Sequence, residues 1–363
     1  MIVWLPFFFL CLWSGVGAET VRAVWVVRHE MTSQERISEV VQQASRAGLN
    51  TLFVQVRGRG DAYYESDLAP PGEGIEPGLD PLAYCVERAR DAGLQVHAWV
   101  NVYLTWYPDR EAPEDHLLRT NPDWFMISSD GIDLGQPGLT DDIVKRGVEG
   151  RYLSPAHPSV SPYLLEVIGE IIDRYRVDGI HLDYVRYPNE HYDYSPLART
   201  GFWADTDTDP PTVGGAEEAV KTWNRWRSAR VTEFVREAKA LLLRRNPALV
   251  LSAAVKPDLE TAYTRYGQNW IDWVNRRYLD VVVPMFYTGS NRRLLERMRL
   301  VRKYVQKGRV VAGIGAWNQD TGDTVKQIEG ARDARLAGFS LFSYETLKSV
   351  PSLQSAMAEE ASR

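Results

Sequence analysis

Eight short runs of β-branched and aromatic residues recur along this chain after residue 20, and longer segments with helical periodicity separate them. The predicted strands lie at residues 22–28, 51–57, 95–101, 178–186, 249–255, 280–287, 309–316 and 338–344. The clearest helical patterns lie at residues 33–47, 81–92, 162–175 and 217–245. This alternation is typical of the α/β class. Eight units predict a single (β/α)8 TIM barrel over residues 19–363.

The sequence disfavours a dinucleotide cofactor and a nucleic-acid partner. A doubly wound open sheet is the main alternative to the barrel, and its dinucleotide-binding form needs a glycine-rich loop after the first strand. Residues 28–35 contain no glycine, so that version is not expected. The formal net charge is −6 and there is no basic run to follow a phosphate backbone. We therefore expect no nucleic-acid partner.

The first eighteen residues have the pattern of a secretory signal peptide. The apolar run over residues 2–13 is too short to span a bilayer, and Val16-Gly17-Ala18 offers small residues for cleavage. We expect export to the periplasm or the medium, with no stable membrane span after cleavage. No Lys or Arg precedes the apolar run, so an uncleaved N-terminal anchor is the alternative. Cys11 would leave with the signal, and Cys85 alone cannot form an intramolecular disulfide.

Two connections are far longer than the usual loops of about two to six residues in such folds. They cover residues 102–161, after the third strand, and residues 187–215, after the fourth. Both leave the carboxyl ends of strands, so we expect both to overhang the rim where barrel enzymes carry their chemistry. Their aromatic residues favour a function; these are Trp106, Tyr107, Trp124, Phe125, Tyr192, Tyr194, Phe202 and Trp203.

The fourth strand ends in a group of ionisable and aromatic residues, Asp-Gly-Ile-His-Leu-Asp-Tyr-Val-Arg-Tyr-Pro at residues 178–188. Side chains on a strand alternate between its faces, so His181 and Asp183 share one face while Leu182 and Tyr184 share the other. In a parallel barrel the apolar face meets the helices. The other face then looks inward, with Asp183 near the carboxyl end. This position makes Asp183 the leading catalytic candidate.

Polar and aromatic residues also stand near the ends of the other predicted strands. Aromatic rings bind the C–H faces of sugars, whereas Asn, Arg and carboxylate groups bind hydroxyls, so we expect a polysaccharide or oligosaccharide substrate. The predicted substrate-binding residues are Arg57, His97, Trp99, Asn101, Trp106, His181, Tyr184, Arg186, Tyr187, Tyr287, Trp317 and Tyr344. The carboxylates that can act with Asp183 are Asp258, Glu345 and Asp61.

Several of these residues also have a purely structural interpretation. Asp183 can pair with Arg57 or Arg186, as buried carboxylates often do. His97 and His181 fit hydrogen-bonded barrel residues better than metal ligands, because isolated ligand pairs are rare. The sequence therefore predicts no metal and no cofactor.

The motifs of this chain resemble those of a known family. They occur in order at residues 22–26, 53–64, 80–82, 93–101, 121–124, 153–155, 178–188 and 283–287. They resemble the family 10-like glycosyl hydrolases, the glycosyl hydrolase-like 10 or DUF187 group, over nearly the whole length after residue 20. The resemblance implies a (β/α)8 barrel, export and glycoside hydrolysis. Some relatives act on bacterial cell-wall glycan strands, including glycan stripped of its stem peptides.

Glycosidases of most families use two carboxyl groups. Asp183 is similar in position to the nucleophile of alpha-amylase-like barrels, although a general-acid role is equally compatible with the sequence. Asp258, after the fifth strand, fits the amylase-like partner, and Asp61 and Glu345 are its rivals. We expect a retaining hydrolase, for which the carboxyl groups lie ~5–5.5 Å apart; ~6.5–9.5 Å would indicate inversion.

Two other functional classes remain open from the sequence. A carbohydrate-binding barrel without turnover would keep the aromatic rim but lack a second carboxylate near Asp183. A metal-dependent hydrolase or deacetylase would use His97, His181 and Asp183 as ligands, although the paired His-x-His of such sites is missing from the first strand. One fold hosts unrelated functions, so the site decides among them.

Overall fold

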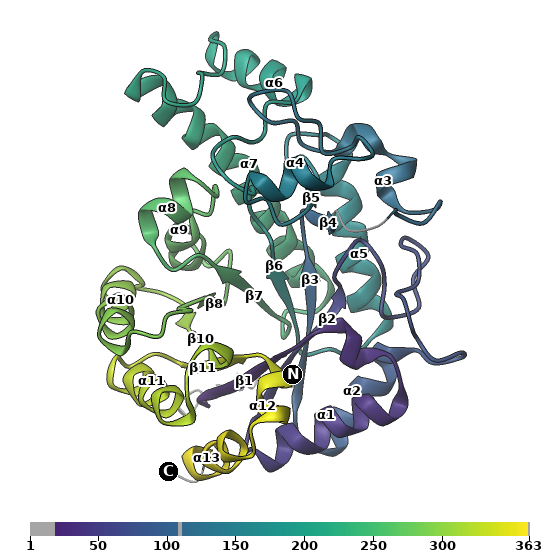
Figure 1. The fold of residues 1–363 in the computed structure, drawn as a ribbon, viewed down its shortest axis with the longest axis vertical. Coiled ribbons are helices and arrows are strands. Elements are labelled where there is room, and N and C mark those ends of the chain that lie inside the picture. Colours follow the sequence, from purple (N-terminus) through teal and green to yellow (C-terminus); the bar gives the residue numbers. More distant parts are fainter. Residues whose placement is uncertain (1–18, 108–110, 362–363) are drawn as a thin grey trace, which may run out of the picture.

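A computed structural model describes residues 19–107 and 111–361, and these residues form a parallel barrel wrapped by helices (Figure 1). The strands are β1 (Val21–Val26), β2 (Thr51–Arg57), β3 (Gln95–Asn101), β6 (Gly179–Asp183), β7 (Val250–Val255), β8 (Val281–Pro284), β9 (Arg309–Val310), β10 (Ala312–Gly315) and β11 (Gly338–Phe342). Their order is β10-β11-β1-β2-β3-β6-β7-β8-β9. The predicted α/β barrel is confirmed. The predicted signal peptide lies outside the described residues.

The ring closes where the seventh predicted strand is divided into β9 and β10. The β9 part pairs with β8, whereas the β10 part pairs with β11. Between them, the Val311 N–H donates to the Val282 carbonyl at 3.0 Å, and Met285 forms a parallel bridge with Gly313. One extended segment therefore joins the two margins of the sheet, so the sixth strand, β8, and the eighth strand, β11, are connected through the seventh.

Helices follow the strands and cover the outside of the barrel (Figure 1). They are α1 (Gln34–Arg46), α2 (Pro81–Asp91), α5 (Val160–Arg174), α7 (Glu217–Arg245), α8 (Leu259–Thr264), α9 (Trp270–Asn275), α10 (Asn291–Tyr304), α11 (Thr321–Asp333), α12 (Tyr344–Ser349) and α13 (Pro351–Ala361). The four helical patterns identified in the sequence correspond to α1, α2, α5 and α7. Among the described helices, none is both long and apolar enough to cross a membrane.

Local sequence explains where the first helix begins and ends. The Ser33 side chain accepts a hydrogen bond from the Arg36 N–H and caps the start of α1. Gly48 follows its end with φ of +67°, a conformation that favours glycine. A Cβ atom at Gly48 would lie 2.2 Å from the Cβ atom of Ala361, so glycine also lets α13 pack closely.

The two long connections fold into compact excursions at the carboxyl end of the barrel (Figure 1). The first contains the antiparallel pair of β4 (Leu104–Trp106) and β5 (Arg151–Tyr152), together with α3 (Leu117–Thr120) and α4 (Thr140–Lys145). The second contains α6 (Pro196–Thr206). The aromatic ring of Phe202 on α6 packs edge-on against Trp223 of α7, at 4.9 Å between centroids. That aromatic residue therefore holds the excursion in place.

A buried, hydrogen-bonded histidine, His181, lies in the interior of the barrel. His181 is fully buried, and its ring stacks on Phe53 at 4.1 Å between centroids. The Trp25 indole N–H donates to His181 Nε2 at 3.0 Å, so Nε2 must carry no proton. The proton is then on Nδ1, which donates to Ser252 Oγ at 2.9 Å, and Ser252 donates in turn to the Ile180 carbonyl. Burial accordingly lowers the pKa of His181 well below 6.5.

The first prediction concerns this chain of hydrogen bonds. Ser252→Ala removes the acceptor of the buried His181 Nδ1–H, so the free energy of unfolding is expected to fall by about 1–3 kcal/mol in urea denaturation. Ser355→Ala, an exposed position on α13, is the control and should change stability by less than about 0.5 kcal/mol. Equal small effects of both substitutions would contradict the assigned role of Ser252.

Candidate active site

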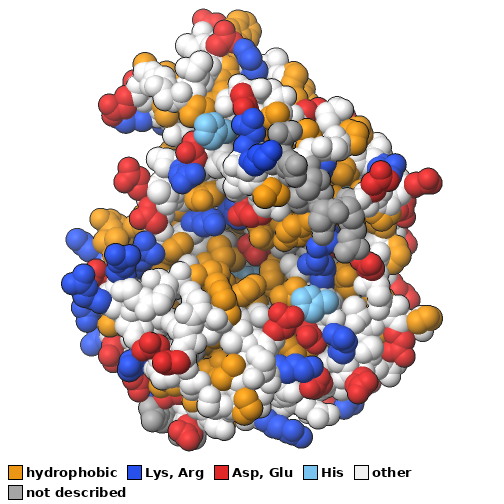
Figure 2. All heavy atoms as spheres, viewed as in Figure 1, with side chains coloured by type: hydrophobic (Ala, Val, Ile, Leu, Met, Phe, Trp, Pro, Cys, Tyr) orange, Lys and Arg blue, Asp and Glu red, His pale blue; other side chains and the backbone are white. Residues whose placement is uncertain are grey.

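A cavity of about 430 Å³ opens at the carboxyl end of the barrel, where the strands direct their last side chains. Figure 2 shows this hollow near the centre of the face, with hydrophobic side chains around it and charged ones at its edge. The lining residues are Trp25, Val27, Arg28, Gln55, Trp99, Tyr107, Glu149, Asp183, Tyr184, Arg186, Ala254, Lys256, Pro257, Met285, Tyr287 and Phe342. This size and mixture suit a small-molecule or sugar site.

Asp183 ends β6 and lies in the wall of this cavity, 8% exposed. Its Oδ1 accepts a hydrogen bond from the Tyr184 N–H at 2.6 Å, and Tyr184 has φ of +48°. The backbone therefore turns into the left-handed region directly after the carboxylate, a strained geometry that often occurs at functional sites. Burial raises the pKa of Asp183 to about 6, and the charges of Arg186 and Lys256 oppose this rise.

A second carboxylate, Glu149, reaches the same cavity from the first excursion, two residues before β5. Its Oε1 accepts a hydrogen bond from Arg186 Nη2 at 2.9 Å, and its Oε2 accepts one from the Tyr152 hydroxyl at 2.9 Å. Burial alone would raise the pKa of Glu149. The charge and hydrogen bond of Arg186, with the Tyr152 hydroxyl and the charge of Lys256, hold it below 4.5 instead.

The two carboxyl groups therefore have opposite pKa shifts within one cavity. Asp183 is raised to about 6, whereas Glu149 is lowered. Near pH 5 the Asp183 carboxyl group mostly holds its proton, whereas Glu149 is a carboxylate. A proton donor beside a negative charge is the arrangement needed for acid–base chemistry on a bound substrate.

Five of the predicted site residues come together in this cavity. Asp183, Trp99, Tyr184, Arg186 and Tyr287 all line it. The structural alternative for Asp183 was an ion pair with Arg57 or Arg186. The Arg186 guanidinium instead bonds Glu149 and lies 4.6 Å from the centroid of the Tyr184 ring.

Trp317 lies at the margin of this group. It is half-exposed and packs edge-on against Tyr287, at 4.8 Å between ring centroids. It does not line the cavity itself, but it extends the aromatic wall that Tyr287 and Phe342 begin.

Two other predicted residues line a neighbouring cavity of about 740 Å³, which shares Arg28 with the first. Asp61 lies there, and its Oδ1 accepts hydrogen bonds from the Gly58 and Arg59 backbone N–H groups. Trp106 lies on the same wall, next to the guanidinium of Arg59. Asp61 is therefore held by backbone groups away from the Asp183 cavity.

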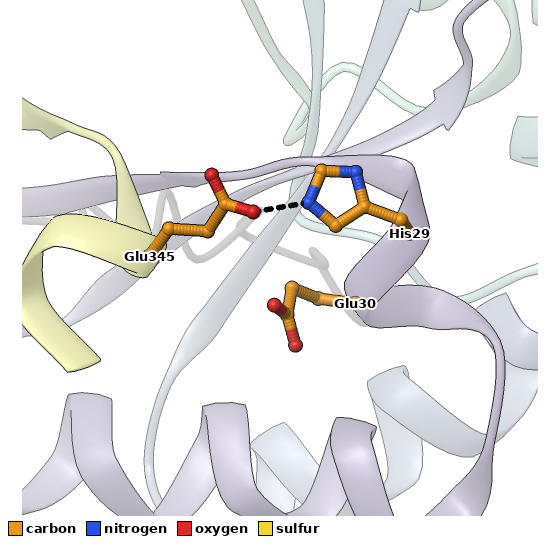
Figure 3. A group of neighbouring side chains, drawn as sticks. All are labelled: His29, Glu30 and Glu345. Atoms are coloured by element: carbon orange, nitrogen blue, oxygen red, sulfur yellow. Dashed lines mark hydrogen bonds and ion pairs between the residues drawn. The ribbon is translucent and has the colours of Figure 1, made fainter. Parts of the chain in front are cut away.

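The remaining two candidate carboxylates have other partners. Asp258 caps α8 and accepts hydrogen bonds from the Thr261 N–H at 2.9 Å and the Thr261 hydroxyl at 2.8 Å. Glu345 bonds His29 Nε2 at 2.5 Å, as Figure 3 shows. Neither residue lines the cavity of Asp183. Capping and ion pairing thus hold both side chains outside this cavity, and the structure does not bring either of them together with Asp183.

Six predicted substrate-binding residues are buried and lie outside both cavity linings. They are Arg57, His97, Asn101, His181, Tyr187 and Tyr344. Arg57 donates to the Asn101 carbonyl rather than to Asp183, and the Asn101 amide donates to the Gly58 carbonyl at 2.8 Å. The Tyr187 hydroxyl donates to the Arg227 carbonyl. The side chains of Arg57, Asn101 and Tyr187 thus bond backbone carbonyl groups.

The three residues considered from the sequence as a metal set, His97, His181 and Asp183, do not gather as possible ligands in the described part of the chain. His181 has both ring nitrogens engaged with Trp25 and Ser252, so it has no lone pair free for a metal ion. In the described ranges, the side chains that do gather as possible ligands are His29, Glu30 and Glu345, within 4.8 Å of one another (Figure 3). The His29–Glu345 pair and the Arg36 guanidinium, 4.0 Å from Glu30, account for this group as ion pairs.

Glu149 was missed by the sequence analysis, and the reason is local. It stands in an excursion with no strand or helix periodicity, among several other charged residues. The available signal was indirect: the unusual length of the excursion pointed to a function, and Tyr107 within it does line the cavity.

Solved structures with a similar fold include sugar-processing enzymes. The catalytic domain of a beta-amylase from Paenibacillus polymyxa has a TM-score of 0.64 and 13% identity, covering 94% of this chain and 98% of that domain. Alpha-L-fucosidase isoenzyme 2 from Paenibacillus thiaminolyticus has a TM-score of 0.63 and 16% identity, covering 94% of this chain and 49% of that one. At such identities the likeness shows the TIM-barrel fold alone.

Sequence relatives are more specific. Glycosyl hydrolase DigH of Escherichia coli (strain K12) is 25% identical over 287 residues, which are 71% of this chain and 59% of DigH. Glycosyl hydrolase YngK of Bacillus subtilis (strain 168) is 26% identical over 188 residues, 46% of this chain and 33% of YngK. The matches thus span less than two thirds of either relative. Residues 20–315 match the glycosyl hydrolase-like 10 family, and the chain belongs to this family.

Proposed function

We propose that this protein is an exported glycoside hydrolase that cleaves O-glycosidic bonds in a polysaccharide, with bacterial cell-wall glycan strands as the substrate. The observation that carries the proposal is the pair formed by Asp183 and Glu149, two carboxyl groups with opposite pKa shifts in one aromatic cavity. The family and the names of the relatives support the same reaction class.

In this mechanism Asp183 is the general acid and base, and Glu149 is the nucleophile. Asp183 donates its proton to the leaving oxygen while the Glu149 carboxylate attacks the anomeric carbon and forms a glycosyl-enzyme ester. Water then attacks the anomeric carbon, Asp183 takes one of its protons, and the Glu149 carboxylate leaves. The two displacements retain the anomeric configuration. Arg186 and Tyr152 bond the two oxygens of Glu149 and fix its orientation.

The walls of the cavity support a polymeric substrate. Trp99, Tyr107, Tyr287 and Phe342 supply flat apolar surfaces for sugar rings. The neighbouring 740 Å³ cavity shares Arg28 with the first, so a chain of sugars can continue from one to the other. Two adjacent cavities of this kind favour endo cleavage over removal of single end units.

A carbohydrate-binding barrel without turnover is the competing proposal. A barrel of this kind is expected to have no second carboxylate near Asp183. Glu149 lines the same cavity as Asp183, and this favours the enzyme.

The second prediction separates the candidate partners of Asp183. On a panel of glycans that includes peptidoglycan strands without stem peptides, Asp183→Asn should lower kcat/KM by about 10²–10⁴-fold. Glu149→Gln should also lose turnover, whereas Asp258→Asn, which preserves the helix cap, should not. Full activity of Glu149→Gln with loss in Asp258→Asn would reverse the assignment. Binding without turnover by the wild type would support the non-catalytic barrel.

The third prediction is the pH profile. Because the proton of Asp183 is required, kcat/KM is expected to fall tenfold per pH unit above about pH 6. On the acidic side it should fall only below the lowered pKa of Glu149, under pH 4.5. If Asp183 were the nucleophile, kcat/KM would instead rise as the pH passes through 6. Proton NMR of the first product formed gives its anomeric configuration and tests retention.

The fourth prediction concerns export. Residues 1–18 should be absent from protein recovered outside the cytoplasm, because Val16-Gly17-Ala18 offers the cleavage site. N-terminal sequencing of the purified protein is expected to begin at Glu19. A protein that retains Met1 and sediments with membranes would support the uncleaved anchor.

A further inference from the structure

Helix α10 and the residues after it concentrate positive charge on one surface of an acidic protein. Residues 291–307 contain seven basic residues and one acidic residue, a formal charge of +6, whereas the whole chain has −6. The basic residues are Arg292, Arg293, Arg297, Arg299, Arg302, Lys303 and Lys307. Apolar residues interrupt them along the sequence, and the helix brings them together in space. Figure 2 shows Lys and Arg side chains gathered at the left of this face, where Figure 1 places α10. Such a surface attracts anions.

The outward face of α10 is rich in cations that lack partners. The buried residues of this helix are Leu294, Met298 and Val301. Arg292, Arg299 and Lys303 are seven and four residues apart, so helical geometry places them together on the opposite, exposed face. Arg292 lies 4.0 Å from Glu296, and among the described residues neither Arg299 nor Lys303 forms an ion pair. The charge of this face is therefore available to a partner.

Two large apolar side chains are exposed beside these cations. Leu300 is 45% exposed and Tyr304 is 46% exposed, and they lie one helical turn apart. The Lys303 ammonium group lies 5.9 Å from the centroid of the Tyr304 ring. A soluble polyanion such as a nucleic acid is bound largely through charge. Exposed apolar residues next to cations are instead typical of a helix that lies on a lipid surface, where they enter the layer beneath the headgroups.

The place of α10 in the barrel determines how such a contact would orient the protein. Helices of a parallel barrel run antiparallel to its strands, so the last turn of α10 lies at the amino end of the barrel, opposite the mouth that contains Asp183. Arg309, at the start of β9, donates to the Glu19 carbonyl at 2.5 Å. The first described residue of the chain therefore lies at this same end.

We propose that α10 binds the surface of a membrane that contains anionic phospholipids. Its Arg and Lys side chains contact the headgroup phosphates, while Leu300 and Tyr304 enter the boundary between headgroups and acyl chains. The binding is peripheral and needs no spanning helix. The mouth of the barrel then opens away from the bilayer. This contact uses neither Asp183 nor Glu149, so it stands or falls independently of the proposed hydrolase.

The fifth prediction is that the purified protein cosediments with vesicles of phosphatidylcholine and phosphatidylglycerol, and binds vesicles of phosphatidylcholine alone much more weakly. Added salt should release it, because ions screen exposed charges. Replacing Arg292, Arg299 and Lys303 together by Gln should lower the partition coefficient on the anionic vesicles by at least about tenfold.

A charge-matched variant controls for the overall charge of the protein. Arg46, Arg90 and Arg225 are exposed arginines on α1, α2 and α7, and replacing all three by Gln removes the same three charges as the α10 variant. Its partition coefficient should stay close to that of wild type. Equal losses in the two triple variants would show that only net charge matters, and would overturn the α10 surface.

The apolar pair distinguishes a lipid surface from a soluble polyanion. Leu300→Ser combined with Tyr304→Ser changes no charge at two exposed positions, so it should weaken binding to anionic vesicles while leaving any binding to a DNA duplex unchanged. If this variant binds vesicles as tightly as wild type does, and the α10 cations bind DNA equally well, the surface is a general polyanion site and the lipid proposal is wrong.

A fluorescent label reports the contact and the orientation directly. Leu300→Cys carries a polarity-sensitive fluorophore, Cys85 is fully buried, and unsubstituted protein treated with the same reagent is the blank. The emission should shift to shorter wavelength on anionic vesicles only. Residues 1–18 contain no charged residue, so attachment through them would not depend on lipid charge. Trp203→Cys, an exposed position on α6, should show no shift. No shift at Leu300, or a shift at Trp203 instead, would overturn the proposal.

Discussion

The parallel pairing of β3, β6 and β7 is the constraint on which the site depends. Its register places Trp99 beside His181 and Asn101 beside Asp183, so the interior is built in layers. The neutral His181 layer, bonded to Trp25 and Ser252 and stacked on Phe53, forms the floor beneath Asp183. That dry floor is the physical origin of the raised pKa of Asp183, because the carboxyl group is solvated only from the mouth of the barrel.

The candidate pair combines two kinds of support. Asp183 is fixed by a strand and by the first hydrogen bond after it, whereas Glu149 is fixed by side chains, Arg186 and Tyr152. These supports set the charges as well as the positions. Asp183 loses hydration without gaining a direct cationic partner, whereas Glu149 gains one in Arg186. Arg186 comes from the chain that follows β6, so it connects the two supports.

The strands were predictable because alternation and β-branched composition act locally, and the long helix α7 was predictable to the residue. Asp183 followed from its place at a strand end. The residues that the structure places outside the cavity are those whose position is decided by depth or by contacts between distant residues. The alternation of side chains along a strand predicts that His181 and Asn101 face the barrel interior. It does not predict whether these side chains reach the cavity or lie below its floor. Nor does spacing along the chain show that Asp258 caps a helix, or that Glu149 folds back onto the mouth.

The origin of Glu149 in an excursion has a consequence for how such proteins diversify. The strands of the segment that joins β3 to α5, β4 and β5, form a separate sheet and are not part of the barrel sheet that carries Asp183. In the proposed mechanism, replacing the part of that segment around Glu149 would exchange the partner of Asp183 while the strand pairing of the barrel sheet stays the same. Evolution can therefore alter the chemistry or abolish it by changing one surface segment, and relatives with the same barrel need not share the same reaction.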